Sequence, residues 1–292
     1  MDFKTRLSDV ASQLETVLAG LLPAPAGHQA IVCEAMRYAA LGGGKRLRPF
    51  LVIESARLFG AQSKGVWQAA AALECLHVYS LIHDDLPCMD DDALRRGKPT
   101  VHIAYDEAIA TLAGDALLTL SFDAMAGCSD RPKTALSLVK ELASAGGVLG
   151  MIGGQVIDIT VPEEGRTQAL ITELQNLKTG ALIEFACVAG PMLAGASEAD
   201  CALLRHYARD MGLAFQIKDD ILDVEGDAAL VGKAVGKDEN LGKATFVSIL
   251  GLEAAREKAT DLGVRAKSHL DSFGKEAEIL CQTVDFVLNR TH

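Results

Sequence analysis

The stretch WQAAAALECLHVYSLIHDDLPCMDDD, residues 67–92, decides the fold class of this chain of 292 residues. In its first part Leu73, Leu76 and Leu81 share one helical stripe, and this spacing predicts an apolar helix from about Trp67 to Ile82. Five aspartates follow in the last nine residues of the stretch, at the C-terminal end of that helix. Because the helix dipole disfavours negative charge at this end, we expect the aspartates to serve a function.

The aspartate cluster begins at Asp84 and resumes at Asp90, after an interval that contains Pro87. A proline disfavours helical geometry at the residue before it, so the chain should bulge before Asp90. We expect this bulge to fold Asp90 back towards Asp84. One such cluster by itself is more often a solvated acidic surface than a binding site.

A second cluster, Asp219-Asp220 with Asp223, lies inside a predicted helix that also carries Gln216. Asp219 and Asp223 are four residues apart and therefore lie on one helix face, about 5–6 Å from each other. Like charges at this spacing repel, and a divalent cation between them would reverse the sign of the interaction. Oxygen ligands without a nearby set of cysteines or histidines indicate Mg²⁺ rather than zinc. Because Mg²⁺ completes its shell with water and substrate phosphates, two facing clusters imply a polyphosphate held between them.

The composition favours an all-α protein. Hydrophobic residues make up 49% of the chain and aromatic residues only 5%, while alanine, the best helix former, is abundant. No run of alternating strand residues is evident in the sequence, and the roughly 100 residues after Pro191 contain no proline. Because no linker or repeat marks a domain boundary, we predict a single helical domain of about ten helices over residues 1–292.

Charge and cysteine content limit the classes of function. The net charge of −11 argues against a nucleic-acid partner, because an acidic chain repels the phosphate backbone. Seven cysteines without a C-x-x-C pair fit neither a disulfide framework nor a zinc ribbon, and they indicate reduced, buried thiols in a cytoplasmic protein. The start MDFKTRLSDV has no apolar run, so we expect no signal peptide. The longest charge-free stretch, residues 142–157, is short for a membrane span; it predicts a buried helix and no stable membrane insertion.

Basic residues suited to phosphate occur in three places. Residues 42–44 form a glycine turn before a helix start, where Lys45 and Arg48 can converge on an anion near free backbone N–H groups. Arg95 and Arg96 follow the first aspartate cluster and offer planar donors for phosphate oxygens. Further basic residues precede or follow the second cluster: Lys178, Lys233 and Lys243. Each alone is more often a surface cation, so their value lies in their order along the chain.

That order is specific. The chain carries in sequence GGGKRLRP at 42–49, His77, DDxxxxD at 84–90, RRG at 95–97, GGQxxD at 153–158, KTG at 178–180 and FQxxDDxLD at 215–223. In these motifs it resembles the trans-isoprenyl diphosphate synthases, and most closely the bacterial farnesyl diphosphate synthases, also called geranyltranstransferases. The resemblance covers about residues 25–260.

The resemblance implies an isoprenoid synthase fold, all-α around a central cavity, in a homodimer. It also implies a prenyltransferase of isoprene biosynthesis that condenses isopentenyl diphosphate head to tail with dimethylallyl and geranyl diphosphate to give (2E,6E)-farnesyl diphosphate. The allylic diphosphate ionises with the help of Mg²⁺, three ions per site, before isopentenyl diphosphate attacks and a proton is eliminated. Metal ions and cationic side chains stabilise the leaving diphosphate, and an apolar cavity keeps the allylic cation from water.

Carried over by motif, the resemblance implies a role for each candidate residue. The metal ligands are Asp84, Asp90 and Asp219, with Asp85 and Asp223 in support. The pocket for isopentenyl diphosphate is formed by Lys45, Arg48, His77 and Arg96. The allylic diphosphate is held by Arg95, Lys178, Thr179, Gln216, Lys233 and Lys243. The catalytic residues among them are Arg95, Lys178, Thr179 and Gln216.

The number of carbons in the product is predicted separately, from the position of Tyr79 in the family resemblance. Tyr79 lies five residues before Asp84, about 7.5 Å along a helix, where a ring would form a floor that stops growth at fifteen carbons. The alternatives are that Tyr79 only packs between helices, or that the product has twenty carbons, as in a geranylgeranyl diphosphate synthase. Two further classes are a terpene cyclase, which lacks the second-substrate pocket, and a non-catalytic partner subunit, which is expected to lose one aspartate motif.

Overall fold

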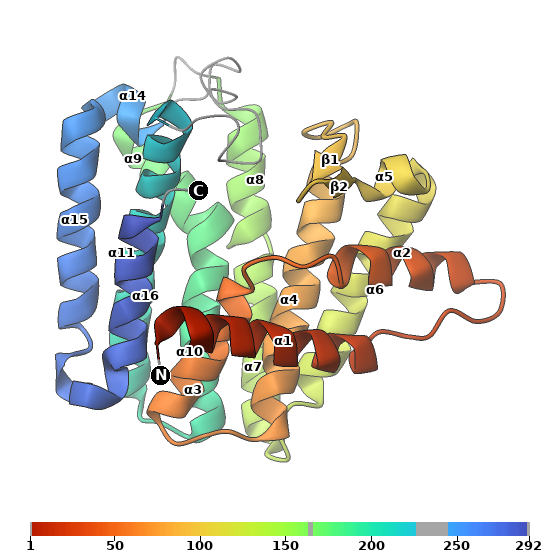
Figure 1. Ribbon diagram of the computed structural model, residues 1–292, viewed down its shortest axis with the longest axis horizontal. Helices are drawn as coiled ribbons and strands as arrows, with labels where there is room; N and C mark the ends of the chain where they lie inside the picture. The colour runs from red at the N-terminus through yellow and green to blue at the C-terminus, as the bar shows by residue number, and fades with distance from the viewer. Residues whose placement is uncertain (1, 163–165, 226–244, 291–292) are drawn as a thin grey trace. The chain divides into compact units, whose positions relative to one another are not determined.

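The computed structural model describes residues 2–162, 166–225 and 245–290, and helices dominate it (Figure 1). The described residues are 78% helical, with 12 α-helices of eight residues or more, and the sheet found among them is one short hairpin. The prediction of an all-α protein with about ten helices is therefore confirmed.

The chain divides into two compact units, Met1–Lys140 and Glu141–His292. Within the first unit lie α1 (Phe3–Leu21), α2 (Ala30–Ala40), α3 (Leu47–Leu58), α4 (Lys64–Asp84), β1 (Leu94–Arg95), β2 (Lys98–Pro99), α5 (Val101–Ala104) and α6 (Glu107–Ala126), while α7 (Pro132–Gly146) crosses the boundary. Within the second lie α8 (Met151–Thr160), α9 (Gln168–Gln175), the π-helix η2 (Asn176–Gly180), α10 (Ala181–Ala194), α11 (Glu198–Glu225), α14 (Phe246–Leu250), α15 (Leu252–Ser268), the 3-10 helix η3 (Asp271–Ala277) and α16 (Glu278–Asn289). The single domain over residues 1–292 stays a prediction.

Helix α4 forms the core of the first unit. All of its residues from 69 to 76 are buried, and a helix buried on every side needs neighbours on every side. It packs against α6, α3 and α1, and α4 and α6 run side by side in Figure 1. The helix predicted from Trp67 to Ile82 is confirmed, and it extends to Asp84.

The second unit is built around the long helix α11, which packs against α15 and α10. The buried hydroxyl of Tyr207 donates a hydrogen bond to the carbonyl of Leu280 at 2.8 Å and so ties α11 to α16. Asp220 is 93% buried, and its carboxylate accepts the backbone N–H of Phe246 at 2.7 Å. This member of the second aspartate cluster therefore fixes the start of α14.

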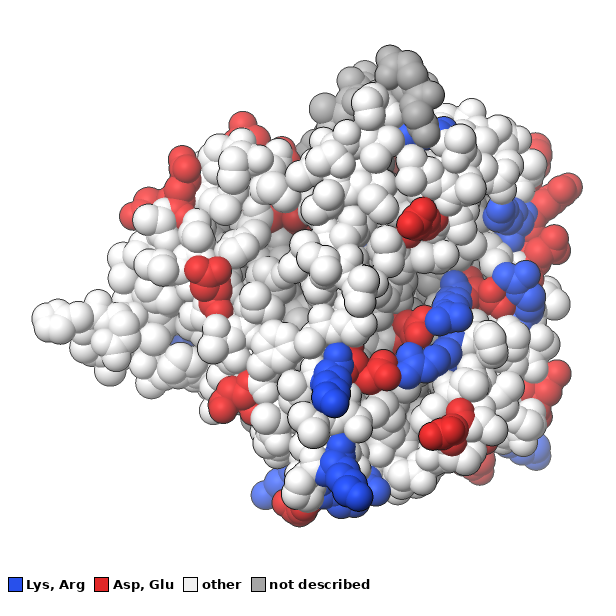
Figure 2. Space-filling view, turned by 180° about the vertical axis from the view of Figure 1, so that it is seen from behind, with Lys and Arg blue, Asp and Glu red and all other residues white. Residues whose placement is uncertain are grey.

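The expectation of one buried helix over residues 142–157 is wrong. Helix α7 ends at Gly146, and Gly150, with φ −142° and ψ −127°, breaks the helical geometry before α8 begins. Val148 and Leu149 in this break are 73% and 78% exposed. Glycine is a poor helix former, and the break that it causes leaves these two apolar side chains at the surface. Figure 2 shows one face of the molecule, with wide stretches of surface that carry no charged side chain.

Within the described part of the chain, three helical segments are long and apolar enough to cross a membrane by length and composition alone: Glu107–Ala126, Pro132–Thr160 and Gln168–Ala194. Between a third and a half of each apolar window is buried inside the protein. The absence of membrane insertion stays a prediction.

Candidate active site

The first aspartate cluster sits where α4 ends. Asp84 is the last helical residue, and the backbone N–H of Asp90 donates to the carbonyl of Asp84 at 2.8 Å. The N–H of Met89 bonds to the carbonyl of Leu86 at the same distance and closes the turn between them. Asp90 therefore folds back onto Asp84, as the position of Pro87 predicted.

Asp85 in this cluster holds a cation. Its carboxylate is 97% buried, and both carboxylate oxygens accept from Arg95 Nε, at 2.8 and 2.9 Å. Asp85 Oδ1 also lies 2.6 Å from Arg95 Nη2. Burial alone would lower the pKa of the Arg95 guanidinium, but these bonds more than offset it and raise that pKa. The β1–β2 hairpin, which the sequence did not indicate, presents Arg95 to Asp85. Asp85 therefore orients Arg95.

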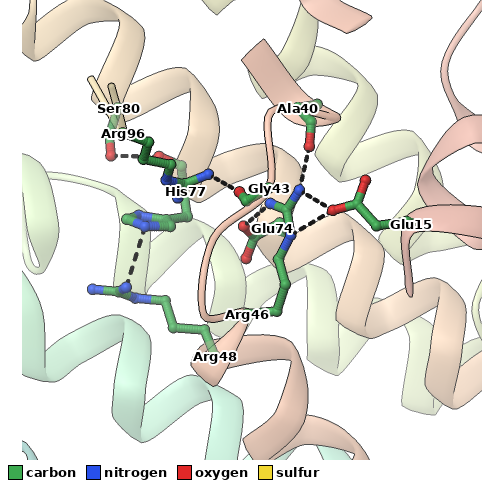
Figure 3. Close-up of polar contacts among 9 residues, drawn as sticks. All are labelled: Glu15, Ala40, Gly43, Arg46, Arg48, Glu74, His77, Ser80 and Arg96. Carbon is green, nitrogen blue, oxygen red and sulfur yellow. Dashed lines mark hydrogen bonds and ion pairs between the residues drawn. The ribbon is translucent and has the colours of Figure 1, made fainter. Parts of the chain in front are cut away.

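Three of the residues predicted for isopentenyl diphosphate lie together in the first unit (Figure 3). Arg48 Nη1 on α3 lies 3.3 Å from His77 Nε2 on α4. Arg96 follows β1, and its guanidinium donates to the carbonyl of Gly43 in the glycine turn. Gly44 has φ +127°, a backbone conformation that residues with a side chain rarely adopt, and the Arg96 guanidinium lies close against it. Lys45 is exposed beside the same turn.

His77 is neutral in this setting. Burial of the ring and then the positive charges of Arg48 and Arg96 hold its pKa well below the ordinary value of 6.5. A guanidinium can only donate, so His77 Nε2 accepts from Arg48 and the neutral ring carries its proton on Nδ1. The first unit thus gathers positive charge around an uncharged acceptor, which is suited to binding an anion.

We expect the His77→Gln variant to lose less stability in acid than the wild type. As pH falls below 6.5, the unfolded chain protonates His77 before the folded chain does, so the wild-type free energy of unfolding decreases by up to about 1.4 kcal/mol per pH unit from this group. Urea unfolding of both proteins between about pH 5 and pH 8 measures the difference. Parallel curves for the two proteins would contradict the lowered pKa of His77.

The second unit contains a pocket lined by residues predicted to bind the metal ion and the allylic diphosphate. Five predicted residues line it: Lys178, Thr179, Gln216, Asp219 and Asp223. Polar residues to which the sequence assigned no role line it too: Asp158, Arg166, Gln175 and Thr245. The predicted cations Lys233 and Lys243 lie outside the described residues.

Lys178 reaches the pocket from a local distortion of the helix. It lies on η2, a single π-helical turn between α9 and α10, and such turns are frequent at functional sites. Helix α8 comes so close that a Cβ on Gly154 would lie 2.2 Å from the backbone nitrogen of Lys178. This approach lets Asp158 on α8 bind Lys178 Nζ at 2.7 Å. Gly154 and Asp158, the second and last residues of the GGQxxD motif, thus together orient Lys178.

Asp219 has a partner that sequence reasoning missed. Arg290, near the end of the chain, places Nη2 3.0 Å from Asp219 Oδ1, and its guanidinium carbon lies 3.8 Å from the centre of the Phe215 ring. The Arg290 side chain is 93% buried, and burial lowers its pKa although Asp219 acts in the opposite direction. No local pattern signals this pair, because its members are far apart in the sequence.

Comparison with known proteins gives consistent similarities. The family described as polyprenyl synthetase matches residues 29–278. The chain is 43% identical to the farnesyl diphosphate synthase of Escherichia coli strain K12 across 99% of both chains. It is 41% identical to the chloroplastic geranylgeranyl pyrophosphate synthase of Capsicum annuum, across 89% of this chain and 72% of that protein. It is also similar to the crystal structure of an FPP/GFPP synthase from Zymomonas mobilis, with a TM-score of 0.88, 44% identity and 98% of each chain covered.

Proposed function

Because the chain belongs to the polyprenyl synthetase family, we propose that it condenses isopentenyl diphosphate with dimethylallyl and geranyl diphosphate to give farnesyl diphosphate. The sequence-based predictions of this family and of a prenyltransferase are confirmed by similarity over nearly the full chain to farnesyl diphosphate synthases. Both aspartate motifs are present, which disfavours a non-catalytic subunit.

The observation that carries the proposal is the pocket of the second unit. Lys178 contributes a positive charge held by Asp158, and Thr179 and Gln216 contribute oxygen dipoles to the same lining. A fixed cation at a departing diphosphate stabilises the charge that develops there, and oxygen dipoles stabilise the allylic cation left behind. Apolar side chains such as Ile171 and Leu174 line the pocket as well, and an apolar lining suits a site that must keep an allylic cation from water.

In the first unit we assign Lys45, Arg48, His77 and Arg96 to isopentenyl diphosphate. The guanidinium groups of Arg48 and Arg96 donate to diphosphate oxygens, while His77 fixes the orientation of Arg48. We assign Arg95, oriented by Asp85, to the allylic diphosphate.

The aspartates fit Mg²⁺. Asp84 and Asp90 in the first unit, and Asp219 and Asp223 in the second, supply oxygen donors only. In the described residues no three His, Cys, Asp or Glu side chains form a closed metal cage, and Mg²⁺ needs only one or two carboxylates when substrate phosphates complete its shell. When bound, Mg²⁺ would neutralise charge on the leaving diphosphate. We propose Asp84, Asp90 and Asp219 as its ligands and three ions per site.

The homodimer is also a proposal. Helix α8 exposes an apolar stripe formed by Ile152, Val156 and Ile159, which continues from Leu149 in the preceding turn. Contiguous exposed apolar surface of this kind typically marks a protein interface. A cytoplasmic location stays a prediction.

The release of diphosphate tests the proposed function against a terpene cyclase. We expect release only when isopentenyl diphosphate and an allylic diphosphate are both present, because condensation requires two substrates. Release from geranyl diphosphate alone, at the rate seen with both substrates, would favour the cyclase and contradict the proposal.

Replacing Tyr79 with alanine is expected to shift the main product from fifteen to twenty carbons. Tyr79 is 94% buried on α4, one turn before the aspartate cluster, and its ring meets the His83 ring edge-on at 5.5 Å. Removing the ring opens space on the helix that leads to Asp84 and so permits one further condensation. Product analysis by chromatography measures the shift, and an unchanged fifteen-carbon product would restrict Tyr79 to packing.

A further inference from the structure

One arginine of the glycine-turn motif is turned away from the substrate pocket. Arg46 lies between Lys45 and Arg48 in the sequence, yet only 3% of it is exposed. Figure 3 shows its guanidinium enclosed by Glu15, Glu74 and the carbonyl of Ala40, whereas Arg48 extends towards His77. Arg46 and Arg48 belong to one motif, but Arg46 contacts two carboxylates in the interior of the unit and Arg48 contacts His77.

The guanidinium of Arg46 joins three helices to the start of a fourth. Its Nε and Nη2 donate to Glu15 Oε1 on α1 at 3.0 and 2.5 Å, and Nη2 also donates to the carbonyl of Ala40 at the end of α2 at 2.5 Å. Its Nη1 donates to Glu74 on α4. Arg46 itself is the residue before α3. A planar group with several donors in fixed directions suits such a junction.

The backbone at Arg46 needs these bonds. It has φ 49° and ψ 35°, the left-handed region that residues with a side chain rarely occupy. A disfavoured backbone conformation persists only when the surrounding structure holds it in place. The direction in which the chain enters α3, and with it the placement of Lys45 and Arg48, therefore depends on the bonds of the Arg46 side chain.

The two carboxylates also offset the charge of Arg46 by forming ion pairs with it inside the junction. Burial alone would lower the pKa of Arg46, but Glu74 and Glu15 more than offset it and raise that pKa, so the guanidinium stays charged and paired. The Arg46 charge is thus compensated within the junction, and the positive charge offered to an anion is that of the pocket residues: Lys45, Arg48 and Arg96.

We propose that Arg46, held by Glu15 and Glu74, is a positioning residue that sets the affinity for isopentenyl diphosphate by fixing Lys45 and Arg48. This inference rests on the proposed function and names residues outside its substrate pocket. It implies that weakening the junction affects one substrate and spares the other.

The Glu74→Gln variant tests this selectivity. It keeps the shape of the side chain and leaves Arg46 its charge partner Glu15. We expect the KM for isopentenyl diphosphate to rise at least tenfold, while the KM for geranyl diphosphate and the kcat stay within threefold of the wild type. Loss of fold alone would lower the active fraction and would not separate the two KM values.

Glu54→Gln is the matched control. Glu54 is as buried as Glu74, lies on α3 of the same unit, and pairs with Arg6 at 2.7 Å and Arg57 at 3.2 Å, away from the glycine turn. We expect both KM values of this variant to stay within threefold. Equal changes of both KM values in Glu74→Gln, or an unchanged KM for isopentenyl diphosphate, would overturn the proposal.

A second variant keeps the test decisive if Glu74→Gln does not fold. The Glu15 side chain is 35% exposed, so Glu15→Gln disturbs the core less and leaves Glu74 on Arg46. We expect a threefold to tenfold rise in the KM for isopentenyl diphosphate alone, and no rise would overturn the proposal. A wild-type protein that does not consume isopentenyl diphosphate would instead overturn the proposed function.

Discussion

The Asp84→Asn variant is expected to have a kcat about a thousandfold below that of the wild type, with an unchanged fold. A carboxylate that binds a metal ion at a leaving diphosphate acts on charge that develops in the transition state, and losing several kcal/mol there costs about this factor. The turn should survive, because Asp84 accepts the Asp90 N–H through its backbone carbonyl. Steady-state kinetics and circular dichroism measure both effects.

Asp91→Asn is the matched control for charge. Asp91 belongs to the same cluster, is exposed, and has φ 51°, a conformation that asparagine tolerates well. The kcat of this variant should stay within about threefold of the wild type, since the change removes only the screened electrostatic field of one exposed charge. Equal losses in both variants would mean that Asp84 acts through net charge and not as a metal ligand.

Replacing Lys178 with glutamine is expected to lower kcat about a hundredfold. Asp158 holds the ammonium at the pocket wall before substrate binds, and removing one preorganised donor to developing negative charge typically has this cost. The KM for isopentenyl diphosphate should change little, because Lys178 is assigned to the allylic diphosphate. Kinetics with geranyl diphosphate as the allylic substrate measure both parameters.

Lys267→Gln is the matched control for Lys178. Lys267 also pairs with an aspartate, Asp285, and its side chain is 35% exposed against 26% for Lys178. It lies on α15 and does not line the pocket of the second unit. A kcat of Lys178→Gln close to that of this control would remove Lys178 from catalysis.

Local features of the site could be predicted from the sequence. The apolar run before Asp84 specified α4, and Pro87 specified the turn that brings Asp90 back to Asp84. The spacing of Asp219 and Asp223 placed both on one face of α11, and both line the same pocket. In each case the deciding interactions are only a few residues apart along the chain.

Features that depend on distant parts of the chain could not be predicted. Arg290 reaches Asp219 only after α15 and α16 have returned the chain to α11, and Glu15 on α1 meets Arg46 only after α2 has returned the chain. The burial of residues 142–157 was predicted from hydropathy alone, which does not show where glycine breaks a helix or which face stays uncovered. Hydropathy therefore misjudged Leu149.

The most direct test of the account is mass spectrometry of the product formed from isopentenyl and dimethylallyl diphosphate, with Mg²⁺ or with EDTA. We expect farnesyl diphosphate as the main product with Mg²⁺ and no condensation product with EDTA. A folded protein that binds both substrates and forms no longer diphosphate in the presence of Mg²⁺ would contradict it.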